Sequence, residues 1–482
     1  MLFNSPLFVF VFLPLALVVF FVVALRGKNL HCVLFLGLAS LVFYGYWNPK
    51  YLVLILASIC GNFALSQGIC RAQGGRRRML LALGVAFNLG LLGYFKYALF
   101  FVENAALLLG RAWSIEAIVL PLAISFFTFQ QIAYLVDCWR GETSPPALAR
   151  YLLFVAFFPQ LIAGPIVHHY EMLPQFEKLG ERPRLGNLVA GLTIFFAGLF
   201  KKVILADGVS GYADAVFEAV AAGTAVGALE AWIGSFAFGF QIYFDFSGYS
   251  DMAIGLALMF GIRLPLNFAS PYKATCIIDF WRRWHMTLSR FLREHLYFPL
   301  GGNRAGWANQ MRNMMIVMLL GGLWHGADWG FVLWGGLHGV YLALNHGWRR
   351  WSPEGLRLRP TLGRSLTLIA VIFAWVPFRA ETWPETQALW LAMLGGGTQA
   401  GSAINDQGLA LLLLAALLAV VWTLPNTQDW SGFAETEAKR MPRWALWQKT
   451  APWAAFNAGL ALAALAVMVG RPETQEFLYF QF

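Results

Sequence analysis

An ionisable side chain, His325, lies within a long apolar stretch of the sequence, in the string Gly-Gly-Leu-Trp-His-Gly-Ala-Asp-Trp. An imidazole at such a place usually faces a cavity or the interior of a helix bundle, because exposure to lipid is costly. With an ordinary pKa of about 6.5 and burial favouring its neutral form, it can accept a hydroxyl proton and make that oxygen nucleophilic toward a thioester. We predict that His325 is a general base. A structural histidine bonded to a carbonyl is the alternative.

Residues 279–298 mix aromatic, apolar and basic side chains. At about 100° per residue, seven apolar side chains share one arc of a helix, and four arginines occupy the opposite arc. These arginines are Arg282, Arg283, Arg290 and Arg293. The pattern predicts a helix in the cytoplasmic interface of a membrane, where the arginines serve as a lipid anchor. Alternatively, Arg282 and Arg283 bind the phosphates of an acyl donor such as coenzyme A.

Four other histidines allow several interpretations. His285 and His295 both fall on the apolar side of the predicted interfacial helix, and the periodicity does not choose between packing and catalysis for either. His338 lies thirteen residues from His325, about 20 Å along an unbroken helix. We therefore favour a packing or channel role for His338, and an interfacial role for His346 at the end of its span.

Two segments interrupt the apolar pattern. Asp245 and Asp251 lie in the middle of an apolar run, and we favour a short interfacial loop over a buried polar cluster that lines a tunnel. Residues 151–167 contain Pro159, Gly164 and Pro165, which predict either a re-entrant hairpin or a kinked span.

The composition requires lipid as the main solvent. Of 482 residues, 59% are hydrophobic and only 12% are charged, which leaves too little polar surface for a soluble globule. About ten to twelve segments are long and apolar enough to span a bilayer. We therefore predict an all-α polytopic membrane protein with a single membrane domain over residues 1–482.

Charge and cysteine usage argue against a nucleic-acid-binding, metal-binding or disulfide-rich protein. The net charge of +10 is spread between apolar spans, so we expect no nucleic-acid partner. The five cysteines show no CxxC spacing, so we expect neither a metal site nor a disulfide framework.

The basic residues also predict orientation. Arg26 and Lys28 follow the first apolar run, and several arginines, from Arg71 to Arg78, follow the third. The positive-inside bias places both connections in the cytoplasm and the N-terminus outside. The first run has no basic leader and no small-residue cleavage site, so we expect it to be a retained span.

Five strings together resemble the membrane-bound O-acyltransferase (MBOAT) family, in the bacterial branch of alginate O-acetylation proteins and teichoic-acid D-alanine exporters. They are Phe-Leu-Pro within residues 1–14, Pro-Gln-Leu-Ile-Ala-Gly-Pro within 157–165, residues 245–251, Phe-Trp-Arg-Arg-Trp-His-Met-Thr-Leu-Ser within 279–289, and Trp-His-Gly at 324–326. They occur in family order over most of the chain.

This resemblance implies a ring of transmembrane helices around a central tunnel, with re-entrant and interfacial helices. It implies that His325 is the membrane-embedded catalytic histidine and His285 the second polar residue of the active site. It further implies acetyl-CoA or another acyl carrier as the donor, reacting from the cytoplasm, with no permanently bound cofactor. The expected setting is the bacterial inner membrane, with a periplasmic N-terminus and a periplasmic SGNH-type acetyltransferase as partner.

The acyl acceptor is predicted only from the resemblance of terminal strings to those of related proteins. The N-terminal string and residues 477–482, Phe-Leu-Tyr-Phe-Gln-Phe, look more like the alginate type, which favours O-acetylation of an alginate-type exopolysaccharide. D-alanyl transfer or peptidoglycan acyl transfer by the same fold is the alternative. A transporter or flippase without chemistry of its own would favour two similarly interrupted halves, and the sequence shows none. A purely structural assembly platform would not need a buried imidazole.

Overall fold

The computed structural model of the protein describes residues 1–113, 115–116, 118–181, 184–304, 306–352, 358–397, 402–434, 446–448, 450–471 and 475–478. Within these ranges the regular structure is helical and contains no strand, which confirms the predicted all-α class. The chain forms two compact units. Unit 1 comprises Met1–Phe195 with Tyr249–Pro265, and unit 2 comprises Phe196–Gly248 with Leu266–Phe482. The prediction of one membrane domain over residues 1–482 stays a prediction.

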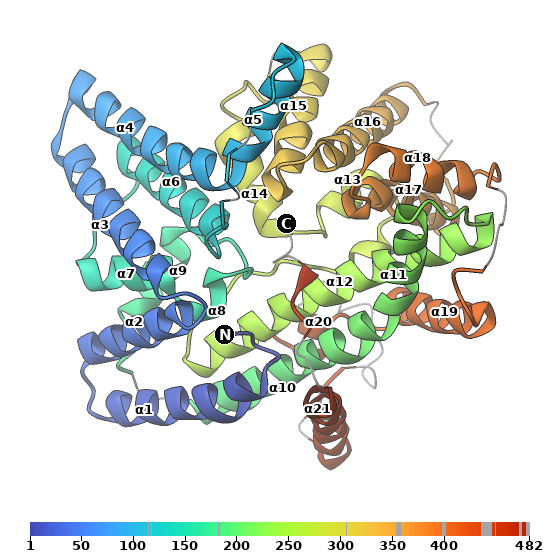
Figure 1. The fold of residues 1–482 in the computed structure, drawn as a ribbon. Helices are drawn as coiled ribbons and strands as arrows, with labels where there is room; N and C mark the ends of the chain where they lie inside the picture. Colours follow the sequence, from blue (N-terminus) through green and yellow to red (C-terminus); the bar gives the residue numbers. More distant parts are fainter. Residues whose placement is uncertain are drawn as a thin grey trace. The chain divides into compact units, whose positions relative to one another are not determined.

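Unit 1 is built from helices that follow one another along the chain, with reversals between α1 and α2 and between α3 and α4 (Figure 1). They are η1 (Phe8–Phe12), α1 (Leu13–Leu25), α2 (Asn29–Gly45), α3 (Lys50–Arg71), α4 (Gly74–Leu92), η2 (Gly93–Tyr97), α5 (Ala98–Leu109), α6 (Ile124–Arg140), α7 (Leu148–Ala156), α8 (Phe158–Leu161) and α9 (His169–Phe176). Two long helices, α10 (Leu185–Phe200) and α12 (Ala228–Met259), pass from one unit into the other. The three predicted N-terminal spans are confirmed as helices.

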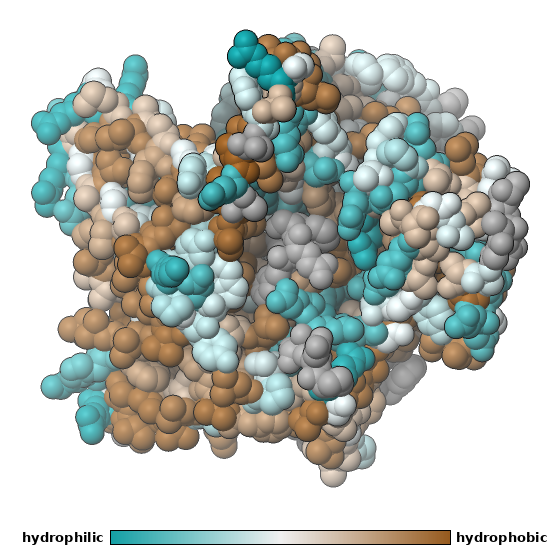
Figure 2. All heavy atoms as spheres, in the orientation of Figure 1, coloured by the Kyte–Doolittle hydropathy of each residue, from teal (hydrophilic) through white to brown (hydrophobic). Residues whose placement is uncertain are grey.

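The two basic connections of unit 1, α1–α2 and α3–α4, lie at the same edge of that unit (Figure 1). Hydrophilic side chains gather at this edge, and hydrophobic ones cover much of the surface over α1 to α4 (Figure 2). This arrangement matches the charge pattern that places both connections on one side of a membrane. Which side is cytoplasmic stays a prediction.

The segment 151–167 does not form a kinked span. Its longest helix, α7, has 9 residues, and after a break at Phe157 the four-residue α8 follows. At 1.5 Å per residue neither helix crosses about 30 Å of hydrocarbon. Residues 157–167 are buried throughout, so protein surrounds the broken backbone, as a re-entrant segment requires.

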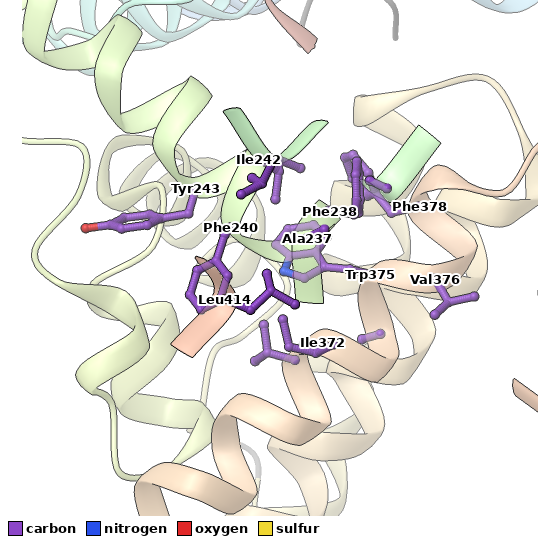
Figure 3. Close-up of a cluster of buried hydrophobic side chains, with 14 of the residues drawn as sticks. Ala237, Phe238, Phe240, Ile242, Tyr243, Ile372, Trp375, Val376, Phe378 and Leu414 are labelled. Carbon is purple, nitrogen blue, oxygen red and sulfur yellow. The ribbon is translucent and has the colours of Figure 1, made fainter. Parts of the chain in front are cut away.

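Unit 2 contains the remaining helices. They are η3 (Lys201–Ala206), α11 (Asp207–Ala221), η4 (Pro271–Lys273), α13 (Ile277–Trp281), α14 (Met286–Leu292), η5 (Arg293–Tyr297), α15 (Trp307–His325), α16 (Trp329–Trp351), α17 (Pro360–Arg379), α18 (Trp383–Met393), α19 (Gln407–Thr423), α20 (Thr427–Ser431) and α21 (Ala451–Gly470). Its core joins α12 and α17 through aromatic and aliphatic side chains such as Phe238, Ile372 and Trp375 (Figure 3).

Six stretches of the described helices are long and apolar enough to cross a membrane, and they confirm a multi-pass membrane protein. They are Phe8–Leu25, Lys50–Arg71, Gly74–Leu109, Leu185–Ala221, Pro360–Arg379 and Ala451–Gly470. Two shorter apolar helices, Asn29–Gly45 and Gln407–Thr423, add to these. The long helices α12, α15 and α16 carry buried polar side chains. The count of ten to twelve spans and their ring around a tunnel stay predictions.

Candidate active site

His325 is the last residue of α15, and its exposed fraction is 6%. The helix ends there because Gly326 adopts an extended conformation, with φ −156° and ψ 151°. Asp328 then caps α16, since its carboxylate accepts a hydrogen bond of 2.6 Å from the Gly330 amide. The chain therefore reverses directly after His325, and α15 and α16 form an antiparallel pair.

Glycines allow α15 and α16 to approach closely. A Cβ atom on Gly322 would collide with the carbonyl oxygen of Phe331, and one on Gly335 with the carbonyl oxygen of Met318. Small residues at a helix interface permit such backbone contact in membranes. The glycines before His325 thus serve helix packing, which fixes the histidine's position.

Aromatic rings surround the His325 imidazole. Its ring centroid lies 5.1 Å from that of Trp334 and 5.3 Å from that of Phe378, both in edge-to-face geometry. The Trp324 ring centroid lies 5.0 Å from that of His325, and the His285 ring centroid lies 6.5 Å from it. The structure therefore brings together the two histidines predicted to be catalytic, although forty residues separate them in the sequence.

His285 is completely buried and has a left-handed backbone, with φ 42° and ψ 54°. This conformation is uncommon for a residue with a Cβ atom and costs about 1–3 kcal/mol, so the surroundings must impose it. They do so through Asn267, whose backbone carbonyl accepts a 2.9 Å hydrogen bond from the Met286 amide. With this backbone conformation, the His285 ring centroid lies 6.5 Å from that of His325.

Asn267 also determines which nitrogen of His285 carries its proton. The His285 Nδ1 atom lies 2.9 Å from Asn267 Oδ1, which also accepts a 2.9 Å bond from the Thr287 hydroxyl. An amide oxygen only accepts, so Nδ1 donates and Nε2 is the basic nitrogen. Burial lowers the pKa of His285, so its neutral form prevails near pH 7. Sequence reasoning missed Asn267, because eighteen residues separate it from His285.

The predicted interfacial helix over residues 279–298 is wrong. The structure has α13, a turn over residues 282–285, α14 and η5. The helix breaks because the Arg283 carbonyl accepts from the Ala269 amide, and the Met286 amide donates to Asn267. These bonds to a neighbouring segment replace those that a continuous helix would make.

The arginines consequently do not share one helical face. Arg283 pairs with Asp279 at 2.9 Å and also donates to the Ala269 carbonyl at 3.3 Å. Arg282 is exposed. His295, also assigned to this helix, lies half-buried in η5 and stacks on Phe291 at 4.7 Å. Donor binding by Arg282 and Arg283 stays a prediction.

His338 is buried beside the same aromatic group. Trp281 Nε1 donates to His338 Nδ1 at 3.3 Å, and the Trp334 ring lies 5.0 Å from it. Because α15 and α16 are separate antiparallel helices, the spacing estimated along one unbroken helix does not apply. Trp334 therefore contacts both His325 and His338, and His338 supports the ring that packs on His325.

The loop predicted around Asp245 and Asp251 is wrong as well. Both residues lie inside the continuous helix α12 and are at most 2% exposed. Asp245 pairs at 2.6 Å with the buried ammonium group of Lys202, which also contacts Asp207 at 2.9 Å. A buried carboxylate requires such a partner, and no local sequence pattern indicates this one, because Lys202 belongs to another helix.

The last described residues contact the buried charge cluster formed by Lys202, Asp207 and Asp245. The Lys202 ammonium group donates to the Glu476 carbonyl at 3.0 Å and lies 5.1 Å from the centre of the Phe477 ring. The Asp245 carboxylate accepts from the Leu478 amide at 3.0 Å. Of the terminal string at residues 477–482, only Phe477 and Leu478 lie within the described residues, and both are buried.

Comparisons with known proteins place this helical membrane protein among acyl-transferring enzymes. The sequence model of the membrane-bound O-acyltransferase family matches residues 139–376. A peptidoglycan O-acetyltransferase of Helicobacter pylori is 44% identical over 82% of this chain and 80% of that protein. A probable alginate O-acetylase AlgI of Azotobacter vinelandii is 39% identical over 87% and 83%, respectively. The teichoic acid D-alanyltransferase of Bacillus subtilis is 26% identical over 53% and 67%.

The chain therefore belongs to the membrane-bound O-acyltransferase family, and it is an O-acyltransferase. The matched region contains His285, His325 and His338. The catalytic roles of His325 and His285 stay predictions at this point.

Proposed function

We propose that the protein takes an acetyl group from cytoplasmic acetyl-CoA and passes it across the inner membrane for O-acetylation of an extracytoplasmic polysaccharide. The observation that carries this proposal is the buried His325–His285 pair, 6.5 Å apart between ring centroids, in a chain related to O-acetyltransferases. A passive transporter needs no such pair of proton acceptors.

The reaction at this pair balances with ordinary acyl-transfer chemistry. The neutral His325 imidazole removes the proton of an acceptor hydroxyl group as its oxygen attacks the acetyl carbonyl carbon. A carbon–oxygen bond forms, the carbon–sulfur bond of the thioester breaks, and the leaving thiolate takes the proton from the imidazolium. The products are an O-acetyl ester and free coenzyme A.

His285 has a supporting role in the proposal. Because Asn267 fixes Nδ1 as the donor, Nε2 presents a lone pair that can accept a hydrogen bond from a second hydroxyl group of the acceptor, and so orient the attacking hydroxyl group toward His325. The strained backbone and complete burial of His285 hold that nitrogen in place. Correct orientation of the hydroxyl group lowers the entropic part of the barrier.

The polymer that receives the acetyl group has two candidates. An alginate-type exopolysaccharide is favoured by the terminal strings of the sequence and by relatives named alginate O-acetylase at 36–39% identity. Peptidoglycan is favoured by the 44% identity to the Helicobacter pylori enzyme. In both cases we propose a periplasmic SGNH-type acetyltransferase as the partner that completes the transfer, and a periplasmic N-terminus.

Deletion of the gene in its host, with plasmid complementation, tests the polymer. Acetyl esters are released by mild alkali from purified exopolysaccharide and from purified peptidoglycan, and are quantified separately. Loss from the exopolysaccharide supports the first candidate, and loss from peptidoglycan supports the second. If both polymers keep their acetyl esters while D-alanyl esters disappear, the acetyl proposal is wrong.

A further inference from the structure

A second feature of unit 2 is an apolar groove of about 1000 Å³ along α16, bordered by α15, α17 and residues 275–277. Large apolar side chains of its lining are exposed, including Leu344 at 66% and Leu366 at 48%. In a membrane protein such side chains meet lipid, so the groove opens toward acyl chains. It shares no lining residue with the His325 site.

The groove has the length of one membrane leaflet. Its lining on α16 runs from Val340 to Trp351, which at 1.5 Å per residue is about 16 Å. Half of a hydrocarbon core of about 30 Å is nearly the same length. Trp307, Trp348 and Trp351 line one end of the groove, and tryptophan is typical of the membrane–water interface.

A positively charged side chain lies at this tryptophan end. Arg349 is exposed, and its guanidinium group contacts the Cys276 thiol at 3.1 Å. Within the part of the chain that the structure describes, Arg349 meets no carboxylate. The nearby carboxylate of Asp279 is already paired with Arg283.

We propose that this groove binds an anionic glycerophospholipid of the surrounding membrane, with an acyl chain along α16 and the phosphate on Arg349. Guanidinium groups bind phosphate oxygens in a bidentate manner, and the apolar wall matches a hydrocarbon chain. A nucleotide donor fits less well, because its polar atoms would face a wall of Leu344, Leu366 and Ala370. The lipid would brace α16, the helix that carries Trp334 and His338.

Native mass spectrometry of the purified full-length protein tests this inference. The protein is mixed with equal amounts of phosphatidylglycerol and phosphatidylcholine, and the bound lipids are counted. The wild type should retain phosphatidylglycerol preferentially. Arg349→Gln should weaken that retention roughly fivefold, as expected for one basic residue at a membrane surface. Arg26→Gln, which removes another exposed arginine at a helix end, is the matched control and should keep the preference.

A second variant tests the acyl-chain half of the proposal. Ala343 lines the groove, so Ala343→Phe should reduce retention of both lipids while Arg349 remains in place. If Arg349→Gln and Arg26→Gln retain phosphatidylglycerol with equal preference over phosphatidylcholine, Arg349 does not bind the lipid phosphate and the proposed site is wrong. Unchanged retention in Ala343→Phe, or full displacement of the lipid by added coenzyme A, would overturn the phospholipid assignment as well.

Discussion

Replacing Lys202 with methionine tests how the buried charge cluster of unit 2 is held together. Methionine has a similar length but no charge, so Asp245, which is 2% exposed, loses the ammonium group 2.6 Å away. Asp207 is affected less, because Arg471 contacts its other carboxylate oxygen at 2.6 Å. The variant therefore leaves one buried carboxylate without a cationic partner.

The expected cost can be worked out from the chemistry of that carboxylate. A buried unpaired carboxylate takes up a proton instead of remaining charged. Protonating an ordinary aspartate at pH 7 costs about 4 kcal/mol, since about 3 pH units each contribute 1.36 kcal/mol. This agrees with the roughly 3–5 kcal/mol lost when one partner of a buried ion pair is removed. The destabilisation should shrink as the pH falls, because protonation then costs less.

The assay is the unfolding midpoint of the purified variants in lipid nanodiscs between pH 5 and pH 8. Lys202→Met should lose much stability at pH 8 and regain part of it at pH 5. Adding Asp245→Leu should restore stability, because no unpaired charge then remains. Arg471→Gln is the control, since Asp207 keeps Lys202, and it should cost at most about 1 kcal/mol. A double variant less stable than Lys202→Met alone would refute this reasoning.

Three further predictions concern helix packing, the donor and the topology. Gly335→Ala should prevent stable folding, because the new Cβ atom would strike a carbonyl oxygen of α15. The Cβ atom of Gly336→Ala would meet only a leucine methyl group at 3.5 Å, so this variant should fold normally. Size-exclusion chromatography of the two purified variants compares their folding. Replacing Arg282 and Arg283 with glutamine should raise the KM for acetyl-CoA more than it lowers kcat, and a fall of kcat alone would exclude a donor site. In a cysteine-free background, Gly75→Cys should resist an impermeant thiol reagent added to spheroplasts, and ready labelling would reverse the orientation.

Hydropathy and charge predicted the part of the fold that depends on local sequence. The first three spans and their basic connections follow from apolar length and from Arg26, Lys28 and the later arginines, and the structure confirms the helices. Each of these helices is determined by its own residues and the surrounding lipid. Periodicity is therefore informative for them.

The site depended on contacts that no local pattern contains. The break at residues 282–285 arises from backbone bonds to residues 267–269, so a helical projection of residues 279–298 could not show it. Lys202 and Asp245 come from different helices, so no pattern around Asp245 indicated that Lys202 is its partner. The closeness of His285 and His325 came from resemblance to the family, and spacing alone left His285 and His295 equivalent.

The most direct test of the central claim is acetyl transfer from labelled acetyl-CoA by the His325→Gln variant, purified in lipid. An amide can keep one hydrogen bond in a similar volume but cannot take up the proton. The variant should therefore match the wild type in thermal stability and lose about a hundredfold to ten-thousandfold in turnover. His338→Gln should be milder, because His338 packs against Trp334 without facing the reacting atoms. A folded His325→Gln protein with near-normal turnover would contradict the assignment of His325 as the general base.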